Sequence, residues 1–206
     1  MFSFDSEEKR TFKIAPAGSH LACLYSIVDL GTHTEEWEGK KADRRKVRLT
    51  FELHGDDTIL DDGSPMSVAM TYTASLGEKA KFREHIEGWR GSKYTNEELV
   101  KFDARKLLGR FCMLNVIHST AKTGGKTYAK IASISGVPKA LMASNPEPLN
   151  DLVYLSLDQF DPKIYSTLPD WMKDMISQTK EYRRATSVEQ PKSSGGMEDF
   201  ESDIPF

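Results

Sequence analysis

The chain has 206 residues, 38% of them hydrophobic, and its 28 basic and 31 acidic side chains give a formal charge of −3. This length fits one large domain or two small ones, and no apolar run approaches the ~18 residues that a membrane-spanning helix needs. The charge is segregated: residues 10–145 carry 21 basic and 16 acidic side chains, a net of +5, whereas residues 187–206 carry a net of −4. A basic body with an acidic end favours phosphate as a partner of the body.

Three strands are predicted in the first third of the chain. Residues 20–30 are apolar at both even and odd positions, which is typical of a strand that is buried on each face along part of its length. Residues 31–43 are predicted to be a polar loop. Residues 44–54 alternate strictly, so one face should be buried and the other, basic at its start, should face water. The apolar positions are Val47, Leu49, Phe51 and Leu53, and the polar ones are Lys46, Arg48, Thr50, Glu52 and His54. Residues 66–73 alternate again, with Tyr72 on the apolar side.

Helical material separates these strands from the next pair. Residues 78–89 carry apolar side chains at approximately helical spacing. Thr95, followed three residues later by Glu98, is a capping box that predicts the start of a second helix. Residues 103–108 are predicted to be a short turn.

Two more strands are predicted at residues 110–118 and 126–135, joined by a hairpin loop that contains glycine. Three strands, a helical insert and a hairpin form the order of an OB-fold, a small five-stranded Greek-key barrel. The expected fold class is therefore mainly β: an OB-fold with a helical insert between strands 3 and 4, a C-terminal helix and a disordered acidic tail.

The expected domain organisation has four parts. A flexible arm over residues 1–18 precedes the OB-fold domain over residues 19–165. A C-terminal helix follows over residues 166–186, and residues 187–206 are rich in Ser, Gly and acids, which predicts disorder. The helix should pack on the barrel or a partner through an apolar stripe. The members of this stripe are Trp171, Met172, Met175, Ile176 and Tyr182.

Catalytic and metal-binding patterns are weak. Gly124–Thr127 reads GGKT, but the earlier glycine of a phosphate-binding loop is missing and a strand rather than a helix is predicted to follow. The pairs Asp56-Asp57 and Asp61-Asp62 could hold a metal, as in a nuclease, yet their setting among Gly and Pro is typical of turns. Cys23 and Cys112 lie in apolar stretches and are expected to be buried reduced thiols of a cytoplasmic protein. We expect a non-enzyme without metal or cofactor, with the nuclease as an open alternative.

Basic and aromatic residues gather where an OB-fold binds single strands. In that fold the binding surface is the face of strands 2 and 3, flanked by the loops that join strands 1 and 2 and strands 4 and 5. Cations neutralise phosphates, and aromatic rings stack on unpaired bases at about 1–3 kcal/mol per base. Glu35, Glu36 and Glu38 weaken this positive field, so a merely solvated charged loop stays open. The predicted phosphate contacts are Lys40, Lys41, Arg44, Arg45, Lys46, Arg48, Lys122, Lys126 and Lys130, and the predicted stacking residues are Trp37 and Tyr128.

The acidic C-terminus has a second recognition pattern. Apolar side chains alternate with acids, and solubility alone does not explain the apolar residues at the last three positions. A partner with an apolar pocket for Phe206 and a basic rim could bind such a peptide. Its acids could also compete with phosphates for the basic body. The predicted partner-binding residues are Asp199, Phe200, Glu201, Asp203, Ile204, Pro205 and Phe206.

The terminal sequence Asp203-Ile204-Pro205-Phe206, after acids and a Gly/Ser-rich linker, resembles the tail tip of bacterial single-stranded DNA-binding proteins. The body is more similar to bacteriophage-encoded members of this group, over Trp37–Leu53, Tyr72–Trp89 and Phe111–Ile134. This resemblance implies an OB-fold body that coats single-stranded DNA. It also implies a tail that recruits replication, recombination and repair proteins in the cytoplasm of a bacterial host.

The function expected is therefore that of a single-stranded DNA-binding protein, with no membrane partner and with a homo-oligomer as an open possibility. The alternative is an OB-like adaptor that mimics the tail to capture host replication or repair enzymes and has little DNA affinity.

Overall fold

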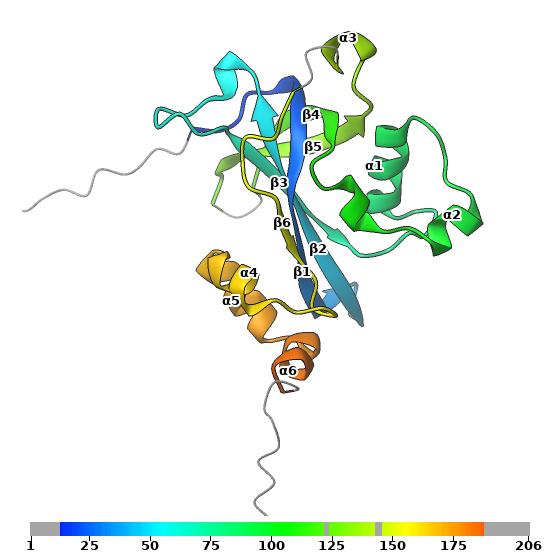
Figure 1. Cartoon of the computed structure of the whole chain (residues 1–206). Coiled ribbons are helices and arrows are strands. Elements are labelled where there is room, and N and C mark those ends of the chain that lie inside the picture. The colour runs from blue at the N-terminus through cyan, green and yellow to red at the C-terminus, as the bar shows by residue number, and fades with distance from the viewer. Residues whose placement is uncertain (1–12, 122–123, 143–145, 188–206) are drawn as a thin grey trace, which may run out of the picture.

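The computed structural model describes residues 13–121, 124–142 and 146–187, apart from the side chain of Trp37 (Figure 1). Within these ranges the protein is mainly β, with a six-stranded sheet and short helices around it. The strands are β1 (Gly18–Trp37), β2 (Lys40–His54), β3 (Ser67–Thr73), β4 (Phe111–Thr120), β5 (Thr127–Ser135) and β6 (Val153–Leu155). The helices are α1 (Lys81–Arg90), α2 (Asn96–Val100), α3 (Lys139–Met142), α4 (Pro162–Thr167), α5 (Asp170–Ser177) and α6 (Lys180–Ser187). Short 3-10 turns lie at Asp56–Thr58 and Ala104–Leu107.

The sheet has the strand order β3-β2-β1-β4-β5, and each of these neighbours pairs in the antiparallel sense. Strand β1 is shared between two ladders: Gly18–Cys23 pairs with β4, while a longer part of the strand pairs with β2. Strand β6 adds to β1 in parallel at Ser26–Val28. The two ends of this order, β3 and β5, also lie close together, and α1 contacts both. The sheet therefore curls toward itself, with α1 against its two end strands.

The first two strands are longer than the sequence predicted, because residues 31–43 continue the β1–β2 ribbon. The register pairs Thr32 with Arg45 and Trp37 with Lys40. Glu38 and Gly39 form the turn, with φ of 49° and 75°. Positive φ at both central residues is the type I′ pattern, whose twist matches that of paired strands. The predicted loop was wrong because the exposed ribbon is polar on both faces, so no apolar alternation reveals it.

The predicted apolar face of β2 is confirmed as part of the core. Leu49, Phe51 and Leu53 are buried, with Phe51 and Leu53 at 0% exposure. Phe82 and Ile86 of α1 pack in the same cluster. Complete burial of such a side chain contributes about 1.5–3 kcal/mol.

Helix α1 approaches β5 closely at Gly88. A Cβ at this position would lie 2.5 Å from the carbonyl oxygen of Ile134. One turn earlier, the buried His85 has its Nδ1 2.8 Å from the hydroxyl of Tyr72 on β3. The expected packing role of Tyr72 is thus confirmed, and α1 is tied to both end strands.

The polar face of β2 was predicted to face water, but one of its side chains is buried. Glu52 is 0% exposed. Its carboxylate accepts hydrogen bonds from the backbone N–H groups of Leu149 and Asn150, each at 2.7 Å, and lies 3.0 Å from Nε2 of His54. The prediction failed at Glu52 because the segment that covers it comes 97 positions later in the chain.

The predicted single helix over residues 166–186 is two helices, α5 and α6, with α4 before them. The helical path breaks at Thr179, whose hydroxyl donates to the carbonyl oxygen of Ile176 at 2.7 Å. Met172 and Ile176 are buried, as the predicted stripe requires, but Trp171 is 46% exposed. One residue along a helix turns the side chain by about 100°, which carries Trp171 off the buried stripe.

Both ends of the chain extend beyond the described ranges. The arm is described from Lys13, and Ala15 is buried in the core. The tail residues from 188 onward lie outside the described ranges. No helix within these ranges is long and apolar enough to cross a membrane.

The two cysteines are free and buried, as predicted. Burial raises the pKa of Cys23 to about 12 and also raises the pKa of Cys112. Both groups therefore stay protonated as thiols at neutral pH, which suits a packing role.

Candidate nucleic-acid interface

One face of β2 and β3 points away from the core and carries part of the predicted basic cluster. Residues paired in register lie on the same face, so Lys46 is beside Thr73 and Arg48 is beside Thr71. Lys46 Nζ donates to Thr73 Oγ1, and an Arg48 guanidinium nitrogen donates to Thr71 Oγ1, each at 3.1 Å. We call these outward positions the β2–β3 face; they are Lys46, Arg48, Thr50, Ser67, Ala69, Thr71 and Thr73.

The C-terminal helices cover the neighbouring part of this face, on β1. Val28 pairs with Arg48 in register and is buried with Leu30 beneath Met172 and Ile176 of α5. Figure 1 shows α4, α5 and α6 gathered beside the β1–β2 ribbon, with α1 and α2 on the other side of the sheet. Ser67 and Thr71 on β3 stay exposed. A ligand would therefore reach the β2–β3 face but not the part of β1 around Val28 and Leu30.

A groove of about 510 Å³ runs from the β2–β3 face to the start of α1. Four cations line it, namely Arg44, Lys46, Lys79 and Lys81. Lys79 and Lys81 were missed by the sequence analysis. The signal was available, because Lys79-Ala80-Lys81 lies a few residues after β3, at the N-terminal end of a helix where the backbone also favours anions. Lys81 pairs with Glu84 at 2.7 Å, whereas Lys79 has no acidic partner within the described ranges.

Carboxylates already engage three of the predicted phosphate contacts. Lys46 Nζ lies 2.7 Å from one oxygen of Glu35, and Arg44 Nε lies 3.7 Å from the other. Arg45 forms an ion pair with Asp29 and a second one with Asp158 at 2.8 Å. The hydrogen bonds that Arg45 donates to the Asp29 carboxylate raise the pKa of Arg45. Arg45 thus ties β2 to the segment that follows β6, and its charge is the least available of the three.

Lys40 and Lys41 lie at the tip of the β1–β2 ribbon and are exposed. A hollow of about 870 Å³ there is lined by both lysines, Arg44 and three glutamates. Neither lysine has an ion-pair partner among the side chains that the structure describes. The glutamates Glu35, Glu36 and Glu38 that were expected to weaken the positive field do line this hollow.

Arg48 has a different environment from these cations. The carbon of its guanidinium lies 5.0 Å from the ring centroid of Trp171 on α5. No carboxylate of the described chain lies within ion-pair distance of it, and its Nε is buried without a hydrogen-bond partner there. Burial lowers the pKa of Arg48. The guanidinium is thus a partly desolvated cation under an aromatic ring.

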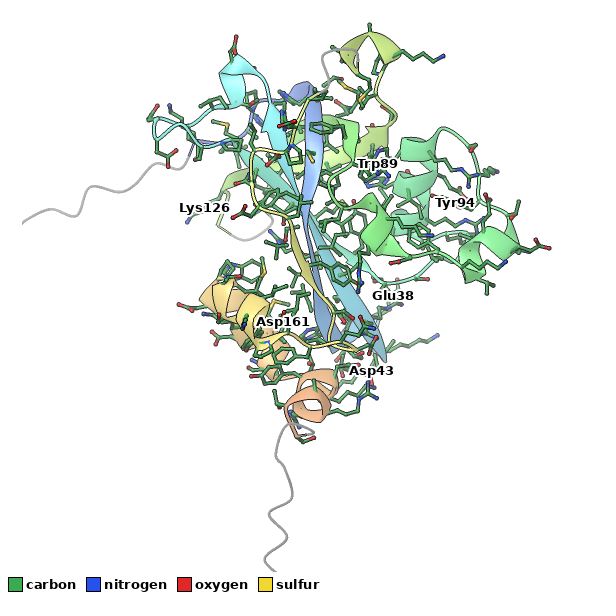
Figure 2. All side chains as sticks on the ribbon, viewed as in Figure 1. Glu38, Asp43, Trp89, Tyr94, Lys126 and Asp161 are labelled. Atoms are coloured by element: carbon green, nitrogen blue, oxygen red, sulfur yellow. The ribbon has the colours of Figure 1, made fainter. Side chains whose placement is uncertain are left out.

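The β4–β5 hairpin carries the remaining predicted residues. Lys126, Tyr128 and Lys130 occupy alternate positions and are all exposed, Tyr128 at 45%. Figure 2 shows Lys126 on the opposite side of the sheet from Tyr94, which follows α1. Because β5 lies close to β3, the outward side of β5 is next to the β2–β3 face around the curled sheet. Lys122, the side chain of Trp37 and the tail residues 199–206 lie outside the described part of the protein.

The acidic pairs form turns. Asp56 and Asp57 begin a 3-10 turn, and Asp62 accepts hydrogen bonds from both the backbone N–H and the hydroxyl of Ser64. These bonds lower the pKa of Asp62. Among the described residues, no group of three or more His, Cys, Asp or Glu side chains is placed to hold a metal ion.

No model of a known protein family matches the chain, and no curated protein matches its sequence.

Proposed function

We propose that the protein is an OB-fold single-stranded DNA-binding protein that coats and protects exposed strands during replication and recombination. The strand order supports the fold: β1 is shared between two ladders, β3 approaches β5, and α1 lies between β3 and β4 in sequence and packs on the curled sheet. A five-stranded Greek-key barrel has this arrangement.

The observation that carries the proposal is the basic groove on the β2–β3 face. Arg44, Lys46, Lys79 and Lys81 line it, and further exposed lysines lie at the ribbon tip and on β5. Threonine hydroxyls between the cations can donate to phosphate oxygens. The binding free energy would come mainly from phosphate contacts that release counterions.

Stacking on exposed aromatic rings would add a preference for single strands. Tyr128 is exposed beside Lys126 and Lys130, so one segment offers both a ring and cations. A base in a duplex is already stacked on its neighbours, whereas an unpaired base can stack on protein.

A titration with oligo-dT at several salt concentrations tests the proposal. We expect the logarithm of affinity to fall linearly with the logarithm of salt concentration, and duplex competitor to displace little protein. Replacing Lys79 with Ala should weaken binding and reduce the salt slope by about 0.7 for each phosphate that the variant no longer neutralises. Lys101→Ala is the matched control, because Lys101 follows α2 on the other side of the sheet and is exposed.

A second candidate is the adaptor that captures host replication and repair enzymes through its tail. The pairing of Glu35 with both Arg44 and Lys46 favours it, because this acid reduces the positive field of the groove. The adaptor would show no salt-dependent binding to oligo-dT. Deletion from Gly195 would abolish partner recruitment for either candidate, but would leave DNA affinity intact or increase it only for the first. A metal-dependent nuclease would instead degrade the oligonucleotide when magnesium is added.

A further inference from the structure

Arg48 differs from the other arginines of β2 in having no acidic partner within the described chain. Arg45 has two carboxylates and Arg44 has one, whereas Arg48 donates to the neutral hydroxyl of Thr71. Its Nε is buried without a partner, and burial lowers its pKa. A cation that is partly removed from water and has no counter-charge binds an anion strongly when one is supplied.

Trp171 lies over this cation. The ring centroid is 5.0 Å from the guanidinium carbon of Arg48, within the range of a cation–π contact. The helix that carries Trp171 is fixed by Met172 and Ile176, which are buried against β1, yet Trp171 itself is 46% exposed. A large aromatic side chain is thus held at a defined place with almost half of its surface in water.

Tyr25 on β1 is a second aromatic side chain that reaches the β2–β3 face, where its hydroxyl lies 3.4 Å from the Oγ of Ser67. The β2–β3 face that carries Arg48 therefore has aromatic side chains from two other elements, Trp171 of α5 over Arg48 and Tyr25 of β1 beside Ser67. Arg48 was correctly predicted on a basic strand, whereas Trp171 was predicted to belong to the apolar stripe that packs on the barrel or a partner.

We propose that Arg48 and Trp171 form a nucleotide subsite, in which Arg48 binds a backbone phosphate and Trp171 stacks on a base. This inference rests on the proposed DNA-binding function. It extends the proposed DNA-binding surface, because α5 would form one border of the β2–β3 face. Single-stranded nucleic acid suits the pair because each nucleotide offers both an anion and an accessible aromatic face. A duplex offers the phosphate but keeps its bases stacked, so it uses only half of the subsite.

The test compares Trp171→Leu, Trp171→Phe and the wild-type protein in oligo-dT titrations followed by anisotropy and by tryptophan fluorescence. Loss of one stacked base should weaken binding about 5- to 150-fold in Trp171→Leu, with a smaller loss in Trp171→Phe, which keeps a ring. Fluorescence quenching by oligo-dT should be reduced in both variants, and the salt slope should not change. Val100→Ala, at an exposed apolar residue of α2, is the control and should bind as the wild type does.

Arg48→Gln tests the other half of the subsite and does not depend on whether the Trp171 variants fold. It should reduce the salt slope by about 0.7, as expected for one phosphate contact to a single strand.

If wild-type protein binds oligo-dT but a folded Trp171→Leu variant shows unchanged affinity and quenching, the subsite is refuted and the proposed function stands. Weaker binding with unchanged quenching assigns Trp171 a structural role and also refutes it. An unchanged salt slope in Arg48→Gln refutes the phosphate contact, and a wild-type protein that does not bind refutes function and subsite together.

Discussion

Glu35 on β1 places a carboxylate oxygen 2.7 Å from Nζ of Lys46 on β2. Its second oxygen lies 3.7 Å from Nε of Arg44. One acid thus faces two of the four cations that line the basic groove. A phosphate that approaches this groove must compete with an anion already present on the protein.

Replacing Glu35 with Gln should therefore strengthen binding to oligo-dT. Side chains of Glu35 and Lys46 are 47% and 15% exposed, so the pair is partly screened by water and we expect a modest gain of about two- to fivefold at low salt. Salt should diminish the gain, because it screens exposed charges. Anisotropy titrations at two salt concentrations measure it.

Glu97→Gln is the control for this prediction. It removes the same charge from an exposed position on α2, away from the groove, and should change affinity much less. Equal gains in the two variants would show that only net charge matters. Equal affinity of Glu35→Gln and wild type would show that Glu35 does not compete with DNA.

The buried carboxylate of Glu52 should be a main support of the C-terminal segment. It accepts hydrogen bonds from the backbone N–H groups of Leu149 and Asn150 and from the Asn150 side chain, at 2.6–2.7 Å. Glu52→Gln keeps the shape of the side chain but turns an NH2 group toward these donors. We expect a loss of about 2–4 kcal/mol in the free energy of unfolding, measured by urea denaturation. A loss below that of the Glu97→Gln control would contradict this role.

Residues whose neighbours are close in sequence were predictable, and residues whose partners come from distant segments were not. The alternation around Leu49 and Phe51 identified β2 because strand periodicity is local. The same alternation misplaced Glu52 in water, since its partners at Leu149 and Asn150 belong to a later segment. Trp171 was misplaced for a related reason: helical spacing shows which residues share a face but not where the buried face ends.

In the candidate site, too, features that depend on local sequence were predictable and contacts between distant segments were not. Sequence predicted that Lys46 and Arg48 lie on the outward face of β2, and the register confirms this. It did not predict that Glu35 pairs with Lys46, because the two were assigned to a loop and a strand rather than to one ribbon. It also missed Lys79, which reaches the groove only because the chain turns from β3 into α1.

His85 should make the stability of the fold depend on pH. It is 2% exposed, and burial lowers its pKa, with Lys81 contributing in the same direction and Glu84 opposing. The folded state therefore binds a proton less readily than the unfolded state, whose histidine titrates near pH 6.5. The contribution of His85 to the free energy of unfolding should be fully present above about pH 6.5. It should decrease as the pH drops below this value, because the unfolded chain gains a proton first.

Thermal unfolding at several pH values between about 5 and 8 tests this dependence. His85→Gln removes the titrating group while keeping a side chain that can bond to the hydroxyl of Tyr72. The variant should be less stable at neutral pH but should lose less of its stability on acidification than the wild type. Parallel curves for the two proteins would assign the pH dependence to other groups.

Gly88 should be required for the contact between α1 and β5. Alanine has the higher helix propensity by about 1 kcal/mol, so at an unconstrained position within a helix the change to Ala would stabilise the protein. Here a Cβ would lie 2.5 Å from the carbonyl oxygen of Ile134, a backbone atom that cannot move without shifting β5. We expect Gly88→Ala to destabilise the fold by about 1–3 kcal/mol, as overpacking does, despite the gain in propensity. Gly77→Ala is the control, because a Cβ there meets only the Ser75 hydroxyl at 3.5 Å. A Gly88→Ala protein as stable as wild type in urea denaturation would mean that α1 can move away from β5 at little cost.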